Sequence, residues 1–351
     1  MHCQCVVKFG TPLVPEDRED MVPEGSEIIM DVLAAGVCHS DLHIRDGGYD
    51  LGHGERLSFE ERGMHLPHIM GHEPVARIAR VGPDVPGDLN RDANYLVYPW
   101  NGCGDCDLCR EGKENFCATP RFLGVHVDGA YSTQVRVPHE RYLFPIGDMA
   151  PEHAAPLACS GLTTYSALKK VEHLLDRTPA VLIGAGGLGL MAVGLVKAMG
   201  GLPPVVVDID PAKRQAALDA GAAAAIDGAA LDAQDQITKA VGKTPEAVVD
   251  FVGAEATTKL GFECLGKDGT MVVVGLFGGA SPWQLVMIAI KSVTIRGSYM
   301  GSLPEFRELM ELVTSKSVPS LPTITFDLDS ANAALDRLVE GKIVGRAVLM
   351  P

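Results

Sequence analysis

The chain lacks the sequence features that are typical of proteins that bind nucleic acids or membranes. It has no excess of basic residues: 30 Lys and Arg stand against 45 Asp and Glu, which gives a formal net charge of −15. Such an acidic chain is a poor partner for nucleic acid or for an anionic membrane surface. It also shows no obvious internal repeat or low-complexity tract. We therefore expect neither nucleic acid nor a membrane among its partners.

A long apolar run is also missing. The most apolar stretch, residues 181–199, is interrupted by five glycines and by Lys197, whereas a membrane span needs about 20 mostly apolar residues. The first residues, MHCQCVVKFG, do not have the basic start and apolar core of a signal peptide. Nine cysteines, odd in number and clustered, suit metal binding better than disulfides. Reduced thiols favour the cytoplasm.

The length of 351 residues, 46% of them hydrophobic, suggests two domains. The first 150 residues contain short β-like segments between Gly and Pro, and from about residue 160 strands and helices alternate, as in a parallel doubly wound sheet. We expect strands at 27–34, 75–81, 95–98, 130–137, 181–183, 205–207, 248–251, 271–274 and 346–350, and helices at 188–199, 211–220, 303–314 and 331–340. The predicted domains are residues 1–157 with 299–351, and residues 158–298.

The least accidental pattern is the run GCGDCDLCREGKENFC, with Cys103, Cys106, Cys109 and Cys117 spaced C-x2-C-x2-C-x7-C. Four thiolates on one loop can close a tetrahedral shell around zinc, and such a closed site is structural. Disulfides or free thiols are the non-metal alternative. An iron–sulfur cluster fits less well, because the last gap differs from the ferredoxin spacing and no Pro follows.

A glycine-rich turn follows the expected strand at 181–183 and opens a helix. It reads Gly184-Ala185-Gly186-Gly187-Leu188-Gly189, the G-x-G-x-x-G pattern of dinucleotide-binding turns. Asp208 ends the next strand, where a carboxylate can bind the adenosine ribose and disfavour a 2′-phosphate. This favours NAD over NADP. Lys213 is either near that ribose or a solvated surface lysine.

Three further soft ligands remain outside the four-cysteine loop: Cys38, His72 and Cys159. Each by itself is more often a packing residue. Together, two thiolates and one imidazole would form a zinc site with a fourth position open for chemistry.

The chain resembles the zinc-dependent alcohol dehydrogenases of the medium-chain dehydrogenase/reductase superfamily over nearly its whole length. The resemblance implies an α/β fold, with a GroES-like β-rich catalytic domain and a Rossmann NAD-binding domain. It implies two zinc ions per chain, a structural one in the four-cysteine loop and a catalytic one. It further implies a homodimer or homotetramer that acts on an alcohol, aldehyde or ketone.

Individual roles follow from the same resemblance. Cys38, His72 and Cys159 match the catalytic zinc ligands. Glu73 matches an acidic residue that approaches the zinc during ligand exchange, with a supporting ion pair as the alternative. Asp41 would orient His72. Ser40 and His43 match the proton relay, with a surface histidine as the alternative for His43. The cofactor contacts implied are His39, Thr163, Val274, Gly275, Leu276 and Arg346.

The implied reaction is reversible, NAD-linked oxidation of primary or secondary alcohols, with zinc as Lewis acid and hydride transfer to the nicotinamide. A polyol dehydrogenase or a ketone or aldehyde reductase of the same superfamily is the alternative. A non-enzymatic zinc-ribbon module would explain the four-cysteine loop but not the glycine turn.

One stretch departs from compact members of the family. Residues 46–68 lengthen the segment between His43 and His72, and we expect them to flank the substrate entrance. We interpret His53, His65 and His68 as loop residues rather than extra ligands. Tyr98 and Trp100 would either line the pocket or pack in the core.

Overall fold

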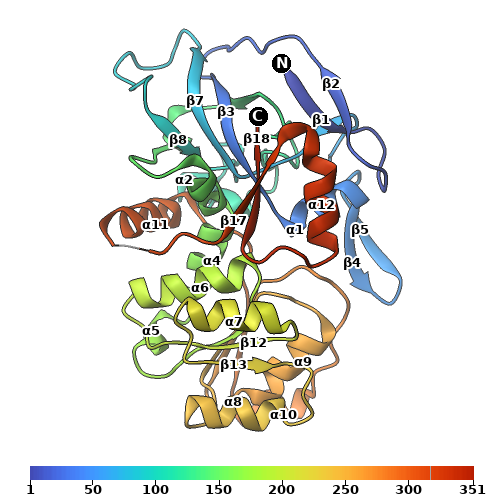
Figure 1. Cartoon of the computed structure of the whole chain (residues 1–351), viewed down its shortest axis with the longest axis vertical. Helices are drawn as coiled ribbons and strands as arrows, with labels where there is room; N and C mark the ends of the chain where they lie inside the picture. Colours follow the sequence, from blue (N-terminus) through green and yellow to red (C-terminus); the bar gives the residue numbers. More distant parts are fainter. Residues whose placement is uncertain (317) are drawn as a thin grey trace.

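The computed structural model describes residues 1–316 and 318–351, and it contains two large sheets stacked along the long axis of the molecule (Figure 1). The lower sheet has six parallel strands in the order β13-β12-β11-β14-β15-β16. Its strands are β11 (Val181–Ile183), β12 (Val205–Asp208), β13 (Ala224–Asp227), β14 (Ala247–Asp250), β15 (Thr270–Val273) and β16 (Thr294–Gly297). The expected Rossmann-type sheet is therefore present.

Helices cover both faces of this sheet, as Figure 1 shows for its lower half. They are α6 (Gly187–Ala198), α7 (Pro211–Asp219), α8 (Ala233–Val241), α9 (Glu255–Cys264) and α10 (Leu285–Lys291). Runs of branched apolar residues such as those of β11 and β12 are fully buried because helices lie on either side of them. The carboxyl ends of these strands face the upper half of the molecule, where a ligand of such a sheet is expected.

The upper sheet has the strand order β10-β8-β7-β3-β18-β17, and β9 also pairs with β3. Its members are β3 (Ile28–Val37), β7 (Pro74–Val81), β8 (Asn94–Val97), β9 (Gln134–Val137), β10 (Leu143–Pro145), β17 (Thr323–Asp327) and β18 (Arg346–Met350). The last strand lies antiparallel to β3, with Val348 opposite Gly36. The C-terminal residues thus complete a sheet that the N-terminal half begins.

Smaller elements surround these sheets. A third, three-stranded sheet joins β1 (His2–Val6), β2 (Val14–Asp17) and β6 (His68–Ile69), and a hairpin joins β4 (Gly48–Gly52) to β5 (Glu55–Ser58). The other helices are α1 (His39–Asp46), α2 (Asp107–Arg110), α3 (Pro151–Ala154), α4 (Ser160–Lys169), α5 (Glu172–Leu175), α11 (Leu303–Ser315) and α12 (Ala331–Val339), with 3-10 turns η1 (Glu114–Phe116), η2 (Glu140–Tyr142), η3 (Ala155–Ala158) and η4 (Leu328–Ser330).

One apolar core spans both halves, and a second, smaller one lies within the lower half. Helix α4 is buried at nine of its ten residues, and it lies between α6 of the lower half and α11. In the described residues, no helix combines the length and apolar character that crossing a membrane would require. Helix α4 therefore packs against both halves of the molecule, and Cys159 directly precedes its first residue.

Several expectations need correction. The segment 46–68 is not a plain loop, because it forms the β4–β5 hairpin, which stands at the side of the molecule in Figure 1. His68 is buried in β6 and lies 3.6 Å from Asp128, so its interpretation as a loop residue was wrong. The strand expected at 130–137 begins only at Gln134.

Candidate active site

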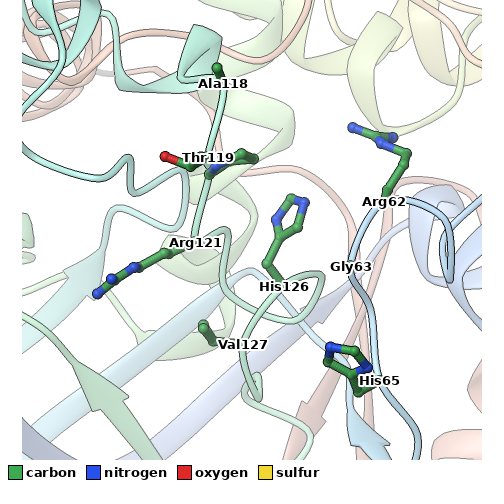
Figure 2. A pocket seen from close by; sticks show the side chains of 9 residues that line it. Arg62, Gly63, His65, Ala118, Thr119, Arg121, His126 and Val127 are labelled. Atoms are coloured by element: carbon green, nitrogen blue, oxygen red, sulfur yellow. The ribbon is translucent and has the colours of Figure 1, made fainter.

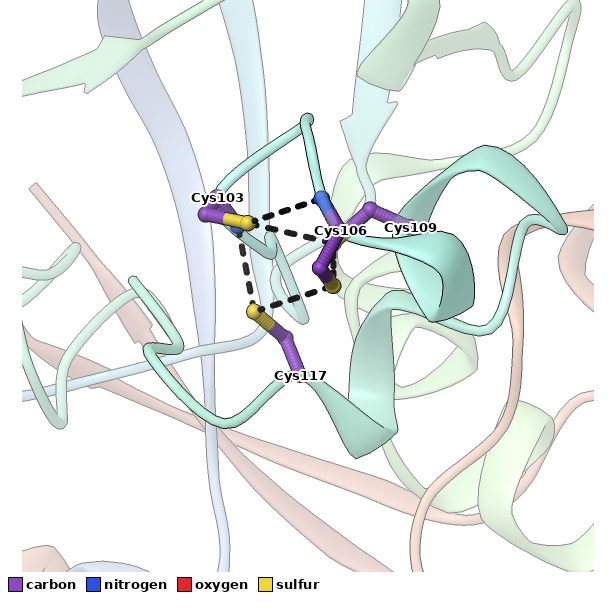
Figure 3. Close-up of side chains that lie close together, drawn as sticks. All are labelled: Cys103, Cys106, Cys109 and Cys117. Carbon is purple, nitrogen blue, oxygen red and sulfur yellow. Dashed lines mark hydrogen bonds between the residues drawn. The ribbon is translucent and has the colours of Figure 1, made fainter.

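The four cysteines of the GCGDCDLCREGKENFC run gather at one point (Figure 3). Their Sγ atoms lie 3.4 Å apart for Cys106 and Cys109, and 3.9 Å apart for Cys106 and Cys117. The amides of Asp105 and Cys106 donate to the Sγ of Cys103, and these donors lower the pKa of that thiol to about 6. Four convergent thiols, some already favoured as thiolates, are a donor set that suits zinc.

A second group of donors lies between the two sheets. Cys38 follows β3, His72 precedes β7, and Cys159 directly precedes α4; together with Glu73 their ligand atoms all lie within 4.8 Å of one another. The Sγ atoms of Cys38 and Cys159 are 4.0 Å apart. All four residues are buried. Three elements distant in the sequence thus bring together the ligand types that the sequence suggested.

The imidazole of His72 faces a buried carboxylate, that of Asp41, on its Nδ1 side. Asp41 Oδ1 lies 3.2 Å from His72 Nδ1, and both side chains are fully buried. The other carboxylate oxygen of Asp41 accepts hydrogen bonds from the Cys38 amide and the Tyr131 hydroxyl. Neither ring nitrogen of His72 has a hydrogen-bond partner among the described residues, and Nε2 has no ion-pair partner either. A buried nitrogen without a partner is costly, and a metal ion beside the two thiols would satisfy it.

Glu73 and Arg346 form a buried ion pair beside this group. A guanidinium nitrogen of Arg346 contacts Glu73 Oε1, while Glu73 Oε2 has no partner among the described residues. Burial raises the pKa of Glu73 to about 7, against the opposing effect of Arg346. Arg346 also packs on the glycine turn, since a Cβ added at Gly187 would meet its side chain. The arginine expected at the pyrophosphate therefore connects the metal-ligand group to the glycine turn.

The glycine turn has the shape that close approach to a ligand requires. Gly184 has a φ of +95°, and a Cβ at Gly189 would collide with the Gly184 carbonyl. Asp208, at the end of β12, accepts a hydrogen bond from the Ala185 amide at 2.7 Å. Gly186 precedes the first turn of α6 and Leu188 lies within it. The turn, the helix start and the carboxylate are thus assembled at one edge of the sheet.

The remaining residues expected to contact the cofactor lie around this edge. Val274, Gly275 and Leu276 follow β15 directly. Thr163 lies one turn into α4, with Oγ1 4.0 Å from the Cys159 Sγ. Burial lowers the pKa of His39, and the charges of Arg346 and Lys213 act in the same direction.

The relay residues share helix α1. Ser40 and His43 are three positions apart and so lie on one face of the helix. The His43 ring packs 5.0 Å from the ring of Tyr49, and burial lowers the pKa of His43.

An open cleft of about 510 Å³ lies between the β4–β5 hairpin and the segment after β15. It is lined by Tyr49, Leu57, Arg62, Gly275, Leu276 and Tyr299, among others. The hairpin therefore lies beside residues expected at the nicotinamide. Trp100 lies 5.2 Å from the His72 ring, whereas Tyr98 is a core residue that donates to the Gly301 carbonyl.

Comparison with known proteins assigns the family. Residues 24–148 match the alcohol dehydrogenase GroES-like domain, and residues 187–315 match the zinc-binding dehydrogenase family. An NAD-dependent alcohol dehydrogenase of Sulfurisphaera tokodaii is 38% identical over 352 residues, with 100% of both chains covered. The chain belongs to the zinc-type medium-chain alcohol dehydrogenases.

Structural and sequence neighbours agree with this assignment. The crystal structure of the alcohol dehydrogenase of the archaeon Aeropyrum pernix matches with a TM-score of 0.90 at 30% identity, over 100% of both chains. A D-arabinose 1-dehydrogenase (NADP(+)) of Saccharolobus solfataricus is 30% identical over 98% of this chain and 96% of that protein. The GroES-like and Rossmann-type halves expected from the sequence are therefore those of this dehydrogenase family.

The sequence analysis did not identify three residues that line the cleft of this alcohol dehydrogenase. Tyr49, Arg62 and Tyr299 line the cleft together. The first two lie in the 46–68 stretch, whose unusual length was the one available signal. Tyr299 follows β16 and carries no local pattern that marks it.

Proposed function

We propose that the chain catalyses reversible, NAD-linked and zinc-dependent oxidation of primary or secondary alcohols to aldehydes or ketones. The observation that carries this proposal is the buried group of Cys38, His72 and Cys159, which includes an imidazole nitrogen without a partner. Two thiols and an imidazole are the donor set of a catalytic zinc with an open position.

Zinc bound by these three residues would act as a Lewis acid on the substrate oxygen, and NAD would supply the hydride acceptor. The protein contributes the shape and charge of the site. Asp41 orients His72 through Nδ1. Both cysteines must lose their protons to act as ligands. The Cys159 thiol and, after it, His72 lower the pKa of Cys38, whereas the contact with Cys38 and burial raise the pKa of Cys159. Glu73 serves, in this proposal, as the neighbouring carboxylate that can exchange with a ligand.

The proton released from the alcohol would leave along α1. Ser40 would accept it from the substrate hydroxyl and release its own hydroxyl proton through the cofactor ribose to His43, which lies on the same helix face and would pass it outward. Because burial lowers the pKa of His43, its ring is neutral at neutral pH and able to accept a proton. Tyr49 packs against that ring and keeps it half-buried.

The dinucleotide would lie across the glycine turn with its pyrophosphate at the start of α6. Gly184, Gly186, Gly187, Leu188 and Gly189 would form the turn, with Asp208 and Lys213 toward the ribose, His39 and Arg346 toward the pyrophosphate, and Thr163, Val274, Gly275 and Leu276 toward the nicotinamide. In this arrangement residues 158–298 form the cofactor-binding domain and residues 1–157 with 299–351 form the domain of the two zinc sites, with Cys159 as the one zinc ligand that comes from the start of residues 158–298.

A second zinc would bind Cys103, Cys106, Cys109 and Cys117 and would have a structural role. Support comes from the convergence of four sulfurs and from backbone amides that donate hydrogen bonds to two of them. The amides of Asp105 and Cys106 donate to the Sγ of Cys103, and the amide of Cys103 donates to the Sγ of Cys117. Such a closed thiolate shell leaves no position for substrate.

We also propose a homodimer or homotetramer in the cytoplasm. Helix α10 has no buried residue, although six of its seven residues are apolar. Leu285 and Val286 are 79% and 68% exposed, and α10 is followed by β16, the edge strand of the parallel sheet. An apolar helix beside an open sheet edge is suited to contact a second copy. Light scattering after gel filtration would give the number of subunits.

The reaction is tested by NADH absorbance with the purified chain on a panel of primary, secondary, aromatic and polyhydroxy alcohols. Turnover of simple alcohols with NAD is expected. Preference for sugars or polyols would favour the polyol dehydrogenase alternative, for which the resemblance to a D-arabinose dehydrogenase is the relevant observation. Absence of turnover on every alcohol and carbonyl, with metal bound, would contradict the proposal.

A further inference from the structure

Arg62 occupies a fixed turn at the border of two hollows. It follows β5, and its amide donates to the Phe59 carbonyl, as does that of Met64. Phe59 and Met64 are 1% and 2% exposed, so buried side chains anchor the turn on both sides of the arginine. Arg62 lines the cleft of about 510 Å³ described above. It also lines an open side pocket of about 600 Å³.

The side pocket has a cationic lining. Its walls are Arg62, Gly63, His65, the segment 118–121, His126 and Val127 (Figure 2), and no acidic residue is among the described residues that line it. In Figure 2 the Arg62 and His126 side chains rise from facing loops, whereas the Arg121 side chain extends away from both. In a chain of net charge −15, a pocket wall without a carboxylate is unexpected.

The guanidinium of Arg62 has no ion-pair partner within the part of the chain that the structure describes, although 45 acidic residues are available in the sequence. Its neighbours are the Phe59 ring, 5.9 Å from the guanidinium carbon, and the Tyr299 phenol. Burial raises the pKa of Tyr299, and Arg62 opposes this rise. Asp50 also lines the cleft, but its carboxylate accepts from the Gly52 amide of its own hairpin. An arginine without a carboxylate beside a cleft is available to an anionic ligand.

His126 offers a second donor. Its Nδ1 accepts the Phe122 amide at 3.3 Å, which leaves the proton of the neutral ring on Nε2. Burial, with a smaller contribution from the charge of Arg62, lowers the pKa of His126 to about 4, so the ring is neutral at neutral pH.

A buried stack of rings lies between this pocket and the metal-ligand group, with Trp100 and Phe122 only 3% and 2% exposed. The ring of His72 packs 5.2 Å from Trp100, Trp100 lies 5.6 Å from Phe122, and Phe122 lies 5.1 Å from His126. Tyr299, beside Arg62, is close enough to Cys159 for the thiol to affect its pKa. Arg62 and Tyr299 line the same cleft as Gly275 and Leu276, which we expect at the nicotinamide, so a molecule that reacts there can extend past Tyr299 to Arg62.

We infer that Arg62 selects substrates, and that the preferred alcohols or carbonyl compounds carry an anionic oxygen group, a carboxylate or a phosphate, distal to the reacting carbon. Arg62 would bind this group through charge-assisted hydrogen bonds, with the Nε2–H of His126 as a further donor. This inference rests on the proposed alcohol dehydrogenase function and specifies its substrate class.

The test compares ω-hydroxycarboxylates of three to eight carbons with their primary amides, which have nearly the same shape but no charge. The holoenzyme should show a higher kcat/KM for the acid than for the amide at one or more chain lengths. Replacement R62Q should lower this acid-to-amide ratio by about 10- to 100-fold, the range for a charge-assisted hydrogen bond. R62K should retain part of the ratio, and R121Q, whose side chain points away, should leave it unchanged. A parallel series of ω-hydroxyalkyl phosphates identifies which anion is preferred.

A binding measurement keeps the inference separate from turnover. Calorimetric titration of the holoenzyme with hexanoate and hexanamide should show tighter binding of hexanoate, and R62Q should abolish the difference. Equal kcat/KM for all acid and amide pairs, or an equal fall for both in R62Q, would overturn the role of Arg62 while leaving the alcohol dehydrogenase proposal intact. A chain that oxidises no alcohol at all but still binds hexanoate through Arg62 would instead overturn the proposed function.

Discussion

The guanidinium of Arg346 pairs with the carboxylate of Glu73, 273 positions away in the sequence, beside the metal-ligand group. Glu73 is fully buried and the Arg346 side chain is 5% exposed. Removing charges from water is costly, and only the mutual attraction and further hydrogen bonds compensate for it. The pair therefore ties β18, the last strand of the upper sheet, to the segment that carries His72.

Breaking this pair should destabilise the protein. Replacement of Glu73 by Gln leaves the Arg346 charge buried without a partner, and we expect a loss of about 3–5 kcal/mol in the free energy of unfolding. Urea denaturation at equal metal content measures it. The control is Glu263→Gln in the exposed pair of Lys259 and Glu263, which should cost no more than about 0.5 kcal/mol. Equal stability of the two variants would show that the buried pair contributes nothing.

Replacing Cys159 by Ala should remove one metal and all turnover. Only Cys38 and His72 would remain of the three expected ligands, whereas the four-cysteine loop lies elsewhere and should keep its zinc. Elemental analysis should therefore fall from two zinc ions per chain to one. Cys264→Ala, another buried cysteine, should keep both ions and full activity. Two zinc ions per chain in an active Cys159→Ala variant would remove Cys159 from the ligand set.

The sequence predicted those parts of the molecule that local patterns encode. The four-cysteine spacing and the glycine turn after a short apolar strand depend on neighbours in the chain, and the structure has both. Most expected strands agree with the structure to within one to three residues, as for β7 and β8. Strand β1, with its sequence HCQCV, was missed because it has no strong β-forming pattern.

The cleft could not be predicted in the same way. Tyr49 and Arg62 reach it through the β4–β5 hairpin and its turn, while Tyr299 arrives from the end of the parallel sheet. These three residues come together only because two segments distant in the sequence pack against each other, and no spacing within the sequence indicates that contact. The same holds for Arg346, whose contact with Glu73 depends on β18 lying beside β3.

Replacing His43 by Gln should change the pH dependence of alcohol oxidation. Burial lowers the pKa of His43, so the neutral, proton-accepting ring persists to a lower pH than in a free histidine. As the pH falls through this lowered pKa, the ring becomes protonated and oxidation should slow. Gln cannot titrate, so the acidic limb should flatten, and the rate at neutral pH should fall by about 100-fold.

The matched control is His173→Gln, which replaces an exposed histidine on α5. It should leave the pH–rate profile unchanged. An identical profile for His43→Gln and the unmodified enzyme would exclude His43 from the relay.

Replacing Asp208 should change the choice between NAD and NADP. Its carboxylate lies at the end of β12 and accepts hydrogen bonds from the Ala185 and Asp210 amides. Asp208→Asn keeps an acceptor for the Ala185 amide but removes the negative charge that repels a 2′-phosphate. The ratio of kcat/KM for NAD to that for NADP should fall by about 10- to 100-fold. Asp210→Asn, at the N-cap of α7, removes a nearby charge and should leave the ratio unchanged. If both variants shift the ratio equally, general electrostatics rather than a ribose contact by Asp208 sets the cofactor preference.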